Sequence, residues 1–130
     1  MAAASRPVEG RRLPRARRIT CDADIRALMK RGKRSGTAHL DVFDSPSPFA
    51  YPRVGVVVPR YRHAVVRRNL VKRRIRELLR TEILPALAEH GQAMDVLVRA
   101  RREAYDASWD DLRAELRTWL ERRCWPVSSS

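Results

Sequence analysis

The stretch Arg67–Arg80, RRNLVKRRIRELLR, decides how this chain of 130 residues folds. Its apolar residues Val71, Ile75, Leu78 and Leu79 recur at the spacing of one stripe of an α-helix. Seven of its fourteen residues are Arg or Lys, and most of them fall on the remaining helix surface. The stretch therefore predicts one helix with a buried apolar face and a concentrated cationic face.

The positive charge of the chain is confined to two segments. The formal net charge is +13 at pH 7. Residues 60–80 carry nine Arg or Lys and one Glu, giving +8, and residues 1–18 carry six Arg and one Glu, giving +5. A charge that serves only solubility mixes both signs at helical spacing. The concentration of Arg, whose planar fork suits phosphate, instead favours a nucleic acid as partner.

Upstream of the basic helix the sequence predicts a short helix and two strands. The short helix is expected over Asp22–Arg31, with Thr20 or Asp22 as its N-cap and Gly32 as its C′ residue. Alternating apolar residues predict that the first strand is half-exposed, and an unbroken apolar run predicts that the second is buried. The expected strands are Thr37–Phe43 and Arg53–Val58, joined by the turn-rich residues 44–52.

Downstream, the basic helix is expected to kink at Pro85 and to end at His90–Gly91. A strand over Met94–Ala100 follows, and a last helix begins near Ser108, where Ser108 and Asp111 resemble a capping box. The order helix, strands, basic helix, strand, helix predicts a single small α+β domain, with helices packed on a three- to four-stranded sheet. The expected apolar stripe of the last helix is Trp109, Leu112, Leu116, Trp119 and Leu120.

No catalytic constellation is visible in the sequence. There is no GxxxxGK or GxGxxG motif, and the three histidines are isolated. His63, in the basic loop, is expected to contact nucleic acid or solvent rather than to act as a base. The paired carboxylates Asp22/Asp24 and Asp110/Asp111 lie at expected helix starts, where they complement the helix dipole. Any catalysis in which this chain takes part is therefore expected to be performed by a partner.

A longer pattern surrounds the basic helix. The strand RVGVVV is followed by a short basic loop and by AVVRRN and KRRIRE, and LPRARRIT and DIRALMKRGKR precede it. Over about residues 13–123 this pattern resembles the protein subunit of bacterial ribonuclease P. The resemblance implies an α-β-β-β-α-β-α fold with a left-handed crossover through the basic helix, against the usual right-handed preference. It also implies a fourth strand, for which Phe49–Tyr51 is the candidate.

The resemblance further implies a role in the 5′ maturation of transfer RNA. In that family an RNA subunit cleaves the phosphodiester bond with Mg²⁺, and the protein holds no cofactor of its own. The chain is then expected to bind ribonuclease P RNA, as one protein per RNA, and the 5′ leader of precursor tRNA. It would be an enzyme only as the subunit of an endoribonuclease.

The family's functional positions can be carried onto this chain. Its Arg-Asn motif falls on Arg68 and Asn69. Its leader cleft, between the first helix and the sheet, corresponds to Ile25, Met29 and Phe43. The residues expected to hold the catalytic RNA are Arg60, Arg67, Arg68, Asn69, Lys72, Arg73, Arg76 and Arg80.

Two departures from the family pattern change these expectations. Leu70 stands where the family usually has Arg, so one contact is lost or moves to Arg67 or Arg74. Ile25 and Met29 stand where aromatic residues are common, and base stacking on an aromatic ring is worth about 1–3 kcal/mol. Leader binding is therefore expected to be weaker, and ordinary core packing is the alternative role for both residues.

The chain is expected to consist of a flexible basic arm (1–18), a single RNA-binding domain (19–124) and a disordered tail (125–130). No membrane span or secretory signal is predicted. Cys21 and Cys124 lack metal-ligand spacing, so reduced thiols in a cytoplasmic protein and no metal site are expected. Two alternatives stay open: a ribosomal or other structural RNA-binding protein, and a DNA-binding regulator, although Asn69 alone on the basic helix suits base reading.

Overall fold

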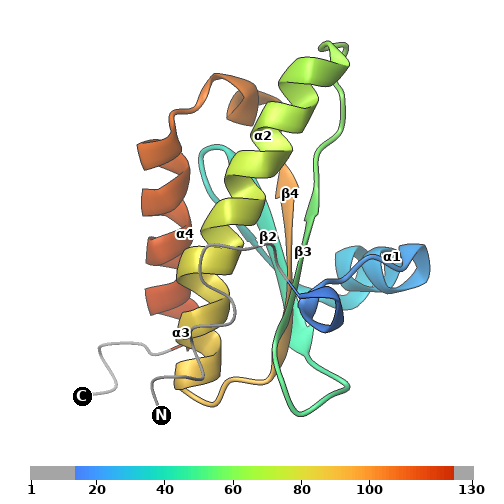
Figure 1. Ribbon diagram of the computed structural model, residues 1–130, viewed down its shortest axis with the longest axis vertical. Coiled ribbons are helices and arrows are strands. Elements are labelled where there is room, and N and C mark those ends of the chain that lie inside the picture. The colour runs from blue at the N-terminus through green and yellow to red at the C-terminus, as the bar shows by residue number, and fades with distance from the viewer. Residues whose placement is uncertain (1–13, 125–130) are drawn as a thin grey trace.

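The computed structural model describes residues 14–124 and arranges them as a four-stranded sheet with helices on both faces (Figure 1). This confirms the predicted α+β class. The strands are β1 (Lys33–Gly36), β2 (Leu40–Pro46), β3 (Arg53–Val57) and β4 (Met94–Ala100). The helices are α1 (Asp22–Arg31), α2 (Val65–Leu78), α3 (Leu84–Glu89) and α4 (Trp109–Cys124), with short helical turns η2 (Arg15–Arg17), η3 (Leu79–Ile83) and η4 (Arg102–Asp106).

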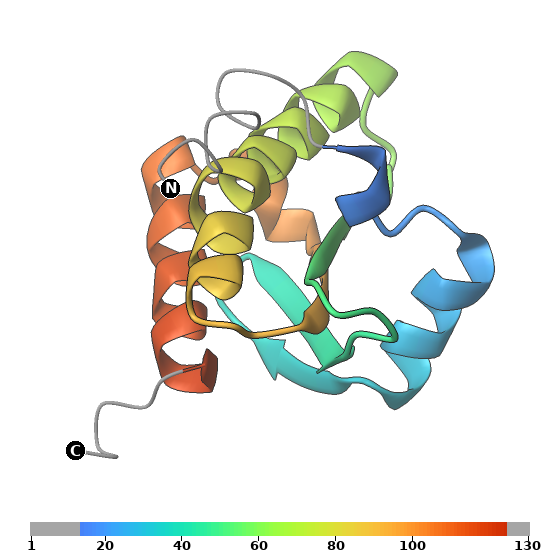
Figure 2. The ribbon, with the colours of Figure 1, turned by 60° about the horizontal axis from the view of Figure 1, so that its bottom comes forward.

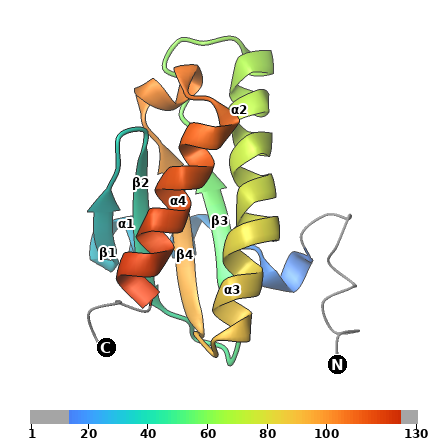
Figure 3. The same cartoon turned by 90° about the vertical axis from the view of Figure 1, so that its left-hand side faces the viewer.

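The sheet has the order β1-β2-β4-β3, and its only parallel pair within the described residues is β3 with β4. In Figure 3 the sheet is seen from the side of α4, and both parallel strands run upward with β4 to the left of β3. The chain connects them through α2, which shares a core with α4 on this face. The crossover is therefore left-handed, as the family resemblance implied and against the general preference.

Two apolar cores lie on opposite faces of the sheet. The larger one joins the sheet to α2, α3 and α4, and the smaller one lies under α1, which Figure 2 shows on the far side of the sheet from α4. Strand β2 contributes to both, with Leu40 and Val42 in the larger core and Phe43 in the smaller. The prediction that this strand is half-exposed was therefore wrong. The smaller core consists of Ile19, Leu28, Phe43 and Leu97, with Ile25, Met29 and Val57 packed against it.

The fourth strand is not at Phe49–Tyr51 but at β1, before the strand that alternation predicted. Strand β1 is short and lies at the sheet edge with exposed polar residues, so it carries no apolar alternation. Thr37 closes the turn between β1 and β2 with a backbone hydrogen bond to Leu40 O at 2.8 Å. For this reason β2 begins at Leu40 instead of Thr37 and extends to Pro46.

The helix caps agree with the sequence only in part. Helix α1 has the predicted bounds, but its N-cap is Cys21, and no side chain caps it. Gly32 has an extended backbone (φ −69°), and a Cβ there would lie 2.6 Å from Leu28 O, so glycine is required by close approach. The capping box of α4 is confirmed, because Asp111 N donates to Ser108 Oγ at 3.0 Å and Ser108 N to Asp111 Oδ2 at 3.2 Å.

The basic helix is interrupted close to the predicted point. The π-helical turn η3 directly precedes Pro85, whose ring cannot continue an α-helical ladder. The helix ends at Glu89, and Gly91 follows with φ 66°. In α4 the predicted apolar stripe is buried except for Trp109, which is 39% exposed at the first residue of the helix.

The folded body begins earlier than predicted. Residues 15–17 form η2, and Arg18 forms a β-bridge with Val54, so residues 14–18 are not part of a flexible arm. The remainder of the predicted arm (1–13) and the predicted tail (125–130) lie outside the described residues.

Candidate nucleic-acid interface

The cations of α2 point in three directions around its buried stripe. Val71, Ile75 and Leu78 face the core. Arg68, Lys72 and Arg76 follow one another at four-residue spacing and therefore form one row along the helix. The other cations of the helix lie further around it, on the outward side or toward η4.

The row ends in a cleft of about 210 Å³ between α2, β3 and the segment that leads into α1. Lys72 and Arg76 line one wall, and Ile25 of α1 lines another. The cleft contains three cationic side chains and no carboxylate, and most of its other residues are apolar. Its lining residues are Arg18, Ile19, Thr20, Ile25, Val54, Gly55, Val56, Lys72, Arg76 and Leu79.

The charges in this cleft lack partners among the described residues. Burial lowers the pKa of Lys72, and the nearby charges of Arg76 and Arg68 lower it further. The Nε atom of Arg18 is buried and makes no hydrogen bond within residues 14–124. A buried donor and three like charges are costly unless an anion is present. The cleft is therefore suited to an anionic ligand with an apolar part.

The floor of the cleft depends on a glycine that the sequence did not single out. Ile19 N donates to Val54 O at 2.8 Å, which lays the chain before α1 along β3. A Cβ on Gly55 would lie 2.9 Å from Ile19 O, so a larger residue would push this segment away. Arg18, Ile19 and Gly55 are therefore site residues that sequence reasoning missed, and the signal that could have found them is the glycine inside an apolar strand.

The other residues predicted to bind RNA fall into two groups. Arg60, Asn69 and Arg73 are exposed, as is Arg76 at the cleft. Three other arginines form hydrogen bonds or ion pairs with neighbouring residues of the chain and therefore also have structural roles. Arg68 Nε donates to Val58 O at 2.8 Å, Arg67 Nη2 donates to Tyr105 O at 3.0 Å, and Arg80 forms an ion pair with Glu77 at 2.6 Å.

Leu70, at the position where the family pattern has Arg, is 39% exposed. The two arginines named as possible replacements both turn toward η4. Arg74 Nη1 donates to Ala107 O at 3.3 Å, and Arg67 also forms an ion pair with Asp106 at 3.5 Å. Val66, one turn before Leu70, is 78% exposed, so this side of α2 is apolar.

The three residues assigned to leader binding do not lie together in the cleft. Ile25 lines the cleft opposite Lys72 and Arg76. Met29 is partly buried against the smaller core, and Phe43 is inside that core and only 6% exposed. A base cannot stack on Phe43 in this packing, so any contact of Phe43 with RNA requires the core to open.

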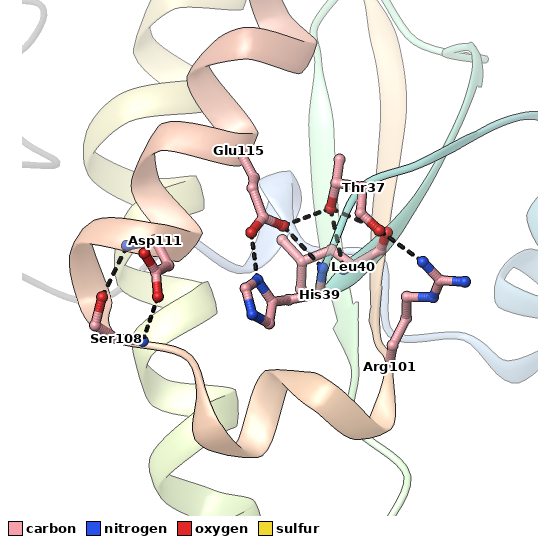
Figure 4. A network of polar contacts seen from close by, with 7 residues as sticks. All are labelled: Thr37, His39, Leu40, Arg101, Ser108, Asp111 and Glu115. Atoms are coloured by element: carbon pink, nitrogen blue, oxygen red, sulfur yellow. Dashed lines mark hydrogen bonds and ion pairs between the residues drawn. The ribbon is translucent and has the colours of Figure 1, made fainter.

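The side of the molecule around α4 shows a different use of charge. Figure 4 shows Glu115 reaching from α4 to the turn between β1 and β2. Its carboxylate accepts hydrogen bonds from Thr37 Oγ1 at 2.6 Å and His39 N at 3.0 Å and contacts His39 Nδ1. Arg101 Nη1 donates to Thr37 O at 2.6 Å on the other side of the same turn. These polar groups tie α4 and the end of β4 to the turn between β1 and β2.

A family model described as Ribonuclease P matches residues 13–123 of this chain. The chain belongs to the ribonuclease P protein family. The ribonuclease P protein component of Kocuria rhizophila is 35% identical over 115 residues, which cover 86% of this chain and 98% of the relative. That of Pseudarthrobacter chlorophenolicus is 33% identical over 105 residues, which cover 80% of this chain and 74% of the relative.

Solved structures of the family have the same fold. The ribonuclease P protein of Staphylococcus aureus superimposes with a TM-score of 0.69 at 26% identity, covering 85% of this chain and 97% of that chain. The protein from Thermotoga maritima gives a TM-score of 0.63 at 25% identity, covering 86% and 96%. The family match takes in the N-terminal segment, β3, α2 and α1, which together build the cleft.

Two further features concern residues 14–124. None of their helices combines the length and apolar character needed to cross a membrane. They also contain no group of three His, Cys, Asp or Glu side chains placed to hold a metal ion.

Proposed function

We propose that this chain binds ribonuclease P RNA and the 5′ leader of precursor tRNA and so supports endonucleolytic 5′ maturation of tRNA. Membership of the family supports its involvement in an endoribonuclease complex. The main support for RNA and leader binding is the cleft that Lys72 and Arg76 of α2 line together with Ile25 of α1.

The composition of the cleft fits single-stranded RNA. Such RNA presents phosphates and unstacked bases together, and proteins bind it with cations and apolar or aromatic surfaces side by side. Arg18, Lys72 and Arg76 would contact phosphates, while Ile25 and Val56 would contact a sugar or base. The pKa of Lys72 is lowered by burial and by the charges of Arg76 and Arg68, and a phosphate nearby would offset both effects. The leader is the single-stranded part of the substrate, so we assign the cleft to it.

The exposed residues on the outward side of α2 are assigned to the RNA subunit. Asn69 and Arg73 lie there, and Arg60 lies in the loop before the helix. Folded RNA offers these residues its backbone rather than its base edges. We also expect one protein per RNA.

The proposal gives the protein no chemical step in the cleavage. The metal ions used in cleavage are assigned to the RNA subunit, as the family resemblance implies. The protein's contribution is electrostatic, because its cations replace counterions that otherwise screen the phosphates of RNA and substrate.

The first test is cleavage of precursor tRNA at low magnesium. RNA subunit transcribed from the same source should cleave slowly alone and faster when this protein is added. Protein with Lys72→Gln and Arg76→Gln should restore less of the rate, because two of the cleft's cations are missing. Cleavage that is unchanged by the wild-type protein would contradict the proposed function.

The second test separates leader binding from binding of the RNA subunit. Ile25→Phe adds a ring to the wall of the cleft, and aromatic stacking should raise the affinity of the holoenzyme for precursor tRNA about fivefold. Affinity for mature tRNA, which has no leader, should stay constant. Phe43→Ala should instead lower stability by about 3–5 kcal/mol, because Phe43 belongs to the core. If Ile25→Phe changes the affinity for precursor and mature tRNA equally, the leader does not bind in this cleft.

A further inference from the structure

A second cationic surface lies at the end of the molecule where β3 and β4 finish. It consists of the β3–α2 loop (residues 59–64), the first turn of α2 and η4, which Figures 1 and 3 both show at the top of the molecule. The acidic residues of η4 are Glu103 and Asp106, of which Asp106 pairs with Arg67 at 3.5 Å. The cations of this loop–η4 surface are Arg60, Arg62, Arg67 and Arg102.

The loop has a strained backbone. Tyr61 and Arg62 have φ values of 47° and 71°, and they are the only non-glycine residues with positive φ in the described part of the chain. His63 N donates to Arg60 O at 2.8 Å, which closes a tight turn around them. Glycine or asparagine usually occupies such positions, and other residues persist there only when the surroundings enforce the conformation.

An aromatic cluster enforces it. His63 stacks on Tyr105 of η4 with ring centroids 3.8 Å apart, and Tyr61 meets Tyr105 edge to face at 6.3 Å. Tyr105 Oη donates to Pro59 O at 2.7 Å and Tyr61 Oη to Ala100 O at 3.3 Å, so both rings are tied to the backbone. Tyr105 is only 5% exposed. It therefore holds the loop from beneath and does not itself present a surface to a ligand.

The same rings also fix two of the cations. The guanidinium of Arg102 lies 5.2 Å from the centre of the Tyr61 ring, and that of Arg67 lies 5.7 Å from the centre of the Tyr105 ring. Arg60 and Arg62 are exposed and form no ion pair within residues 14–124. Arginines held in place before binding lose less side-chain freedom when they meet a phosphate.

We propose that the loop–η4 surface is a second RNA-binding surface, which contacts the phosphate backbone of the RNA subunit through Arg62 and Arg102. Tyr105 is its positioning residue. The inference rests on the proposed function and extends it to residues outside the family's Arg-Asn motif. The surface is separate from the cleft, because Arg67 and Arg76 are nine residues apart and so about 14 Å apart along the helix.

The partner is RNA rather than a protein for two reasons. The surface presents arginines in excess of acidic residues, which suits phosphates at regular spacing. Its central ring, Tyr105, is buried and Tyr61 and His63 are half-buried, whereas a protein-binding patch exposes aromatic rings at its centre.

The decisive variant is Arg62→Gly, because it separates folding from binding. Glycine removes the charge and also relieves the positive φ, so Tm should stay constant or rise. Affinity for the RNA subunit at 0.1 M salt should fall about fivefold, and the slope of log K against log salt should decrease by about one unit. Arg102→Ala should act in the same direction. The matched control Arg117→Ala removes one exposed charge from α4 and should change neither quantity.

A higher Tm with unchanged RNA affinity for Arg62→Gly would show that the turn is merely strained and would overturn the proposal. Failure of the proposed function looks different, because then the wild-type protein itself would not bind the RNA subunit. In that case Arg73→Ala on α2 would also have no effect. Wild-type binding that Arg73→Ala weakens and that Arg62→Gly and Arg102→Ala do not would reject this surface alone.

The role of Tyr105 is tested with two variants. Tyr105→Phe keeps the ring under His63 and loses only the hydrogen bond to Pro59, so RNA affinity should stay within about twofold of wild type. Tyr105→Leu removes the stack, and the folded protein should show the lower affinity and salt slope of Arg62→Gly. A purely structural role would lower Tm and the folded fraction but leave the affinity and slope of the folded protein unchanged, which would reject Tyr105 as a positioning residue.

Discussion

Helices α2 and α4 are both rich in arginine and pack on the same face of the sheet, but they use their charges differently. Helix α4 has four Arg and four acidic residues, whereas α2 has six cations and one Glu. From α4, Arg113 pairs with Glu82 at 3.0 Å and Arg123 with Asp44 at 2.9 Å. Arg68, Lys72, Arg73 and Arg76 of α2 form no ion pair within residues 14–124.

This difference shows which arginines belong to the fold and which are available to a partner. Asp44 is buried and accepts three hydrogen bonds from Arg123, which raise the pKa of that arginine. Lys72, by contrast, has a pKa lowered by burial and by the charges of Arg76 and Arg68. A cation with a carboxylate partner stabilises the native chain. A group of cations without one destabilises the native chain until an anion binds.

The largest effect is expected where a matched pair is broken. Arg123→Ala should lower the free energy of unfolding by about 3 kcal/mol, because it leaves the buried Asp44 carboxylate without its main partner. Affinity for the RNA subunit should not change in the folded protein. Chemical denaturation and RNA titration measure the two quantities. A loss of RNA affinity with unchanged stability would contradict the assignment of Arg123 to the fold.

Charge reversal on α2 should give the opposite result. Lys72→Glu with Arg76→Glu should weaken binding of precursor tRNA by the holoenzyme roughly 100-fold at 0.1 M salt, since two contacts with leader phosphates become repulsive. Tm should not fall, because the substitutions remove repulsion among like charges. Reversal of Arg117 and Arg122 on α4 is the matched control. An equal loss of affinity in both double variants would indicate a general charge effect rather than a specific helix.

A smaller effect concerns pH. Because the folded chain holds the Lys72 proton less tightly than the unfolded chain does, the stability contributed by Lys72 rises as pH increases through its lowered pKa. RNA affinity should change in the opposite direction. As the pH rises, Lys72 loses its charge before the pH reaches the ordinary lysine pKa of 10.5, and the affinity should begin to decline there. Binding of the wild type and Lys72→Arg is compared between pH 8 and 10, where the arginine variant should decline less. If affinity depends on pH in the same way for both proteins, Lys72 does not contact the RNA.

The smallest effect is expected at the one acidic residue of α2. Glu77→Ala breaks the ion pair with Arg80, which lies at the surface through the Glu77 side chain, and such surface pairs contribute about 0–1 kcal/mol. RNA affinity should rise slightly or remain within about twofold. A clear loss of affinity would mean that Glu77 orients Arg80 for binding.

Much of the fold could be predicted from the sequence because its strongest signals are local. The apolar stripe of α2, the bounds of α1 and β4 and the capping box at Ser108 all follow from spacing within one element. Strand β1 could not be found in this way, because an exposed edge strand of polar residues has no apolar period. The left-handed crossover was predicted from the family resemblance alone, because local sequence does not encode it.

The site was predictable only where its residues lie on one helix. Lys72 and Arg76 were proposed from their spacing, but their place in one cleft with Ile25 and Arg18 depends on tertiary packing. Phe43 was assigned to a cleft and lies in a core, because alternation in a strand cannot tell a covered face from an open one. The loop–η4 surface was missed because Tyr105 is 42 residues from His63 in sequence.

The central claim is that unmatched cations of α2 bind the RNA subunit, and the salt dependence of that binding tests it most directly. Two single variants with the same net charge are compared with wild type: Arg73→Gln on α2 and Arg117→Gln on α4. We predict that the slope of log K against log salt decreases by about one unit for the α2 variant and stays constant for the α4 variant. Equal slopes in both variants would contradict the account.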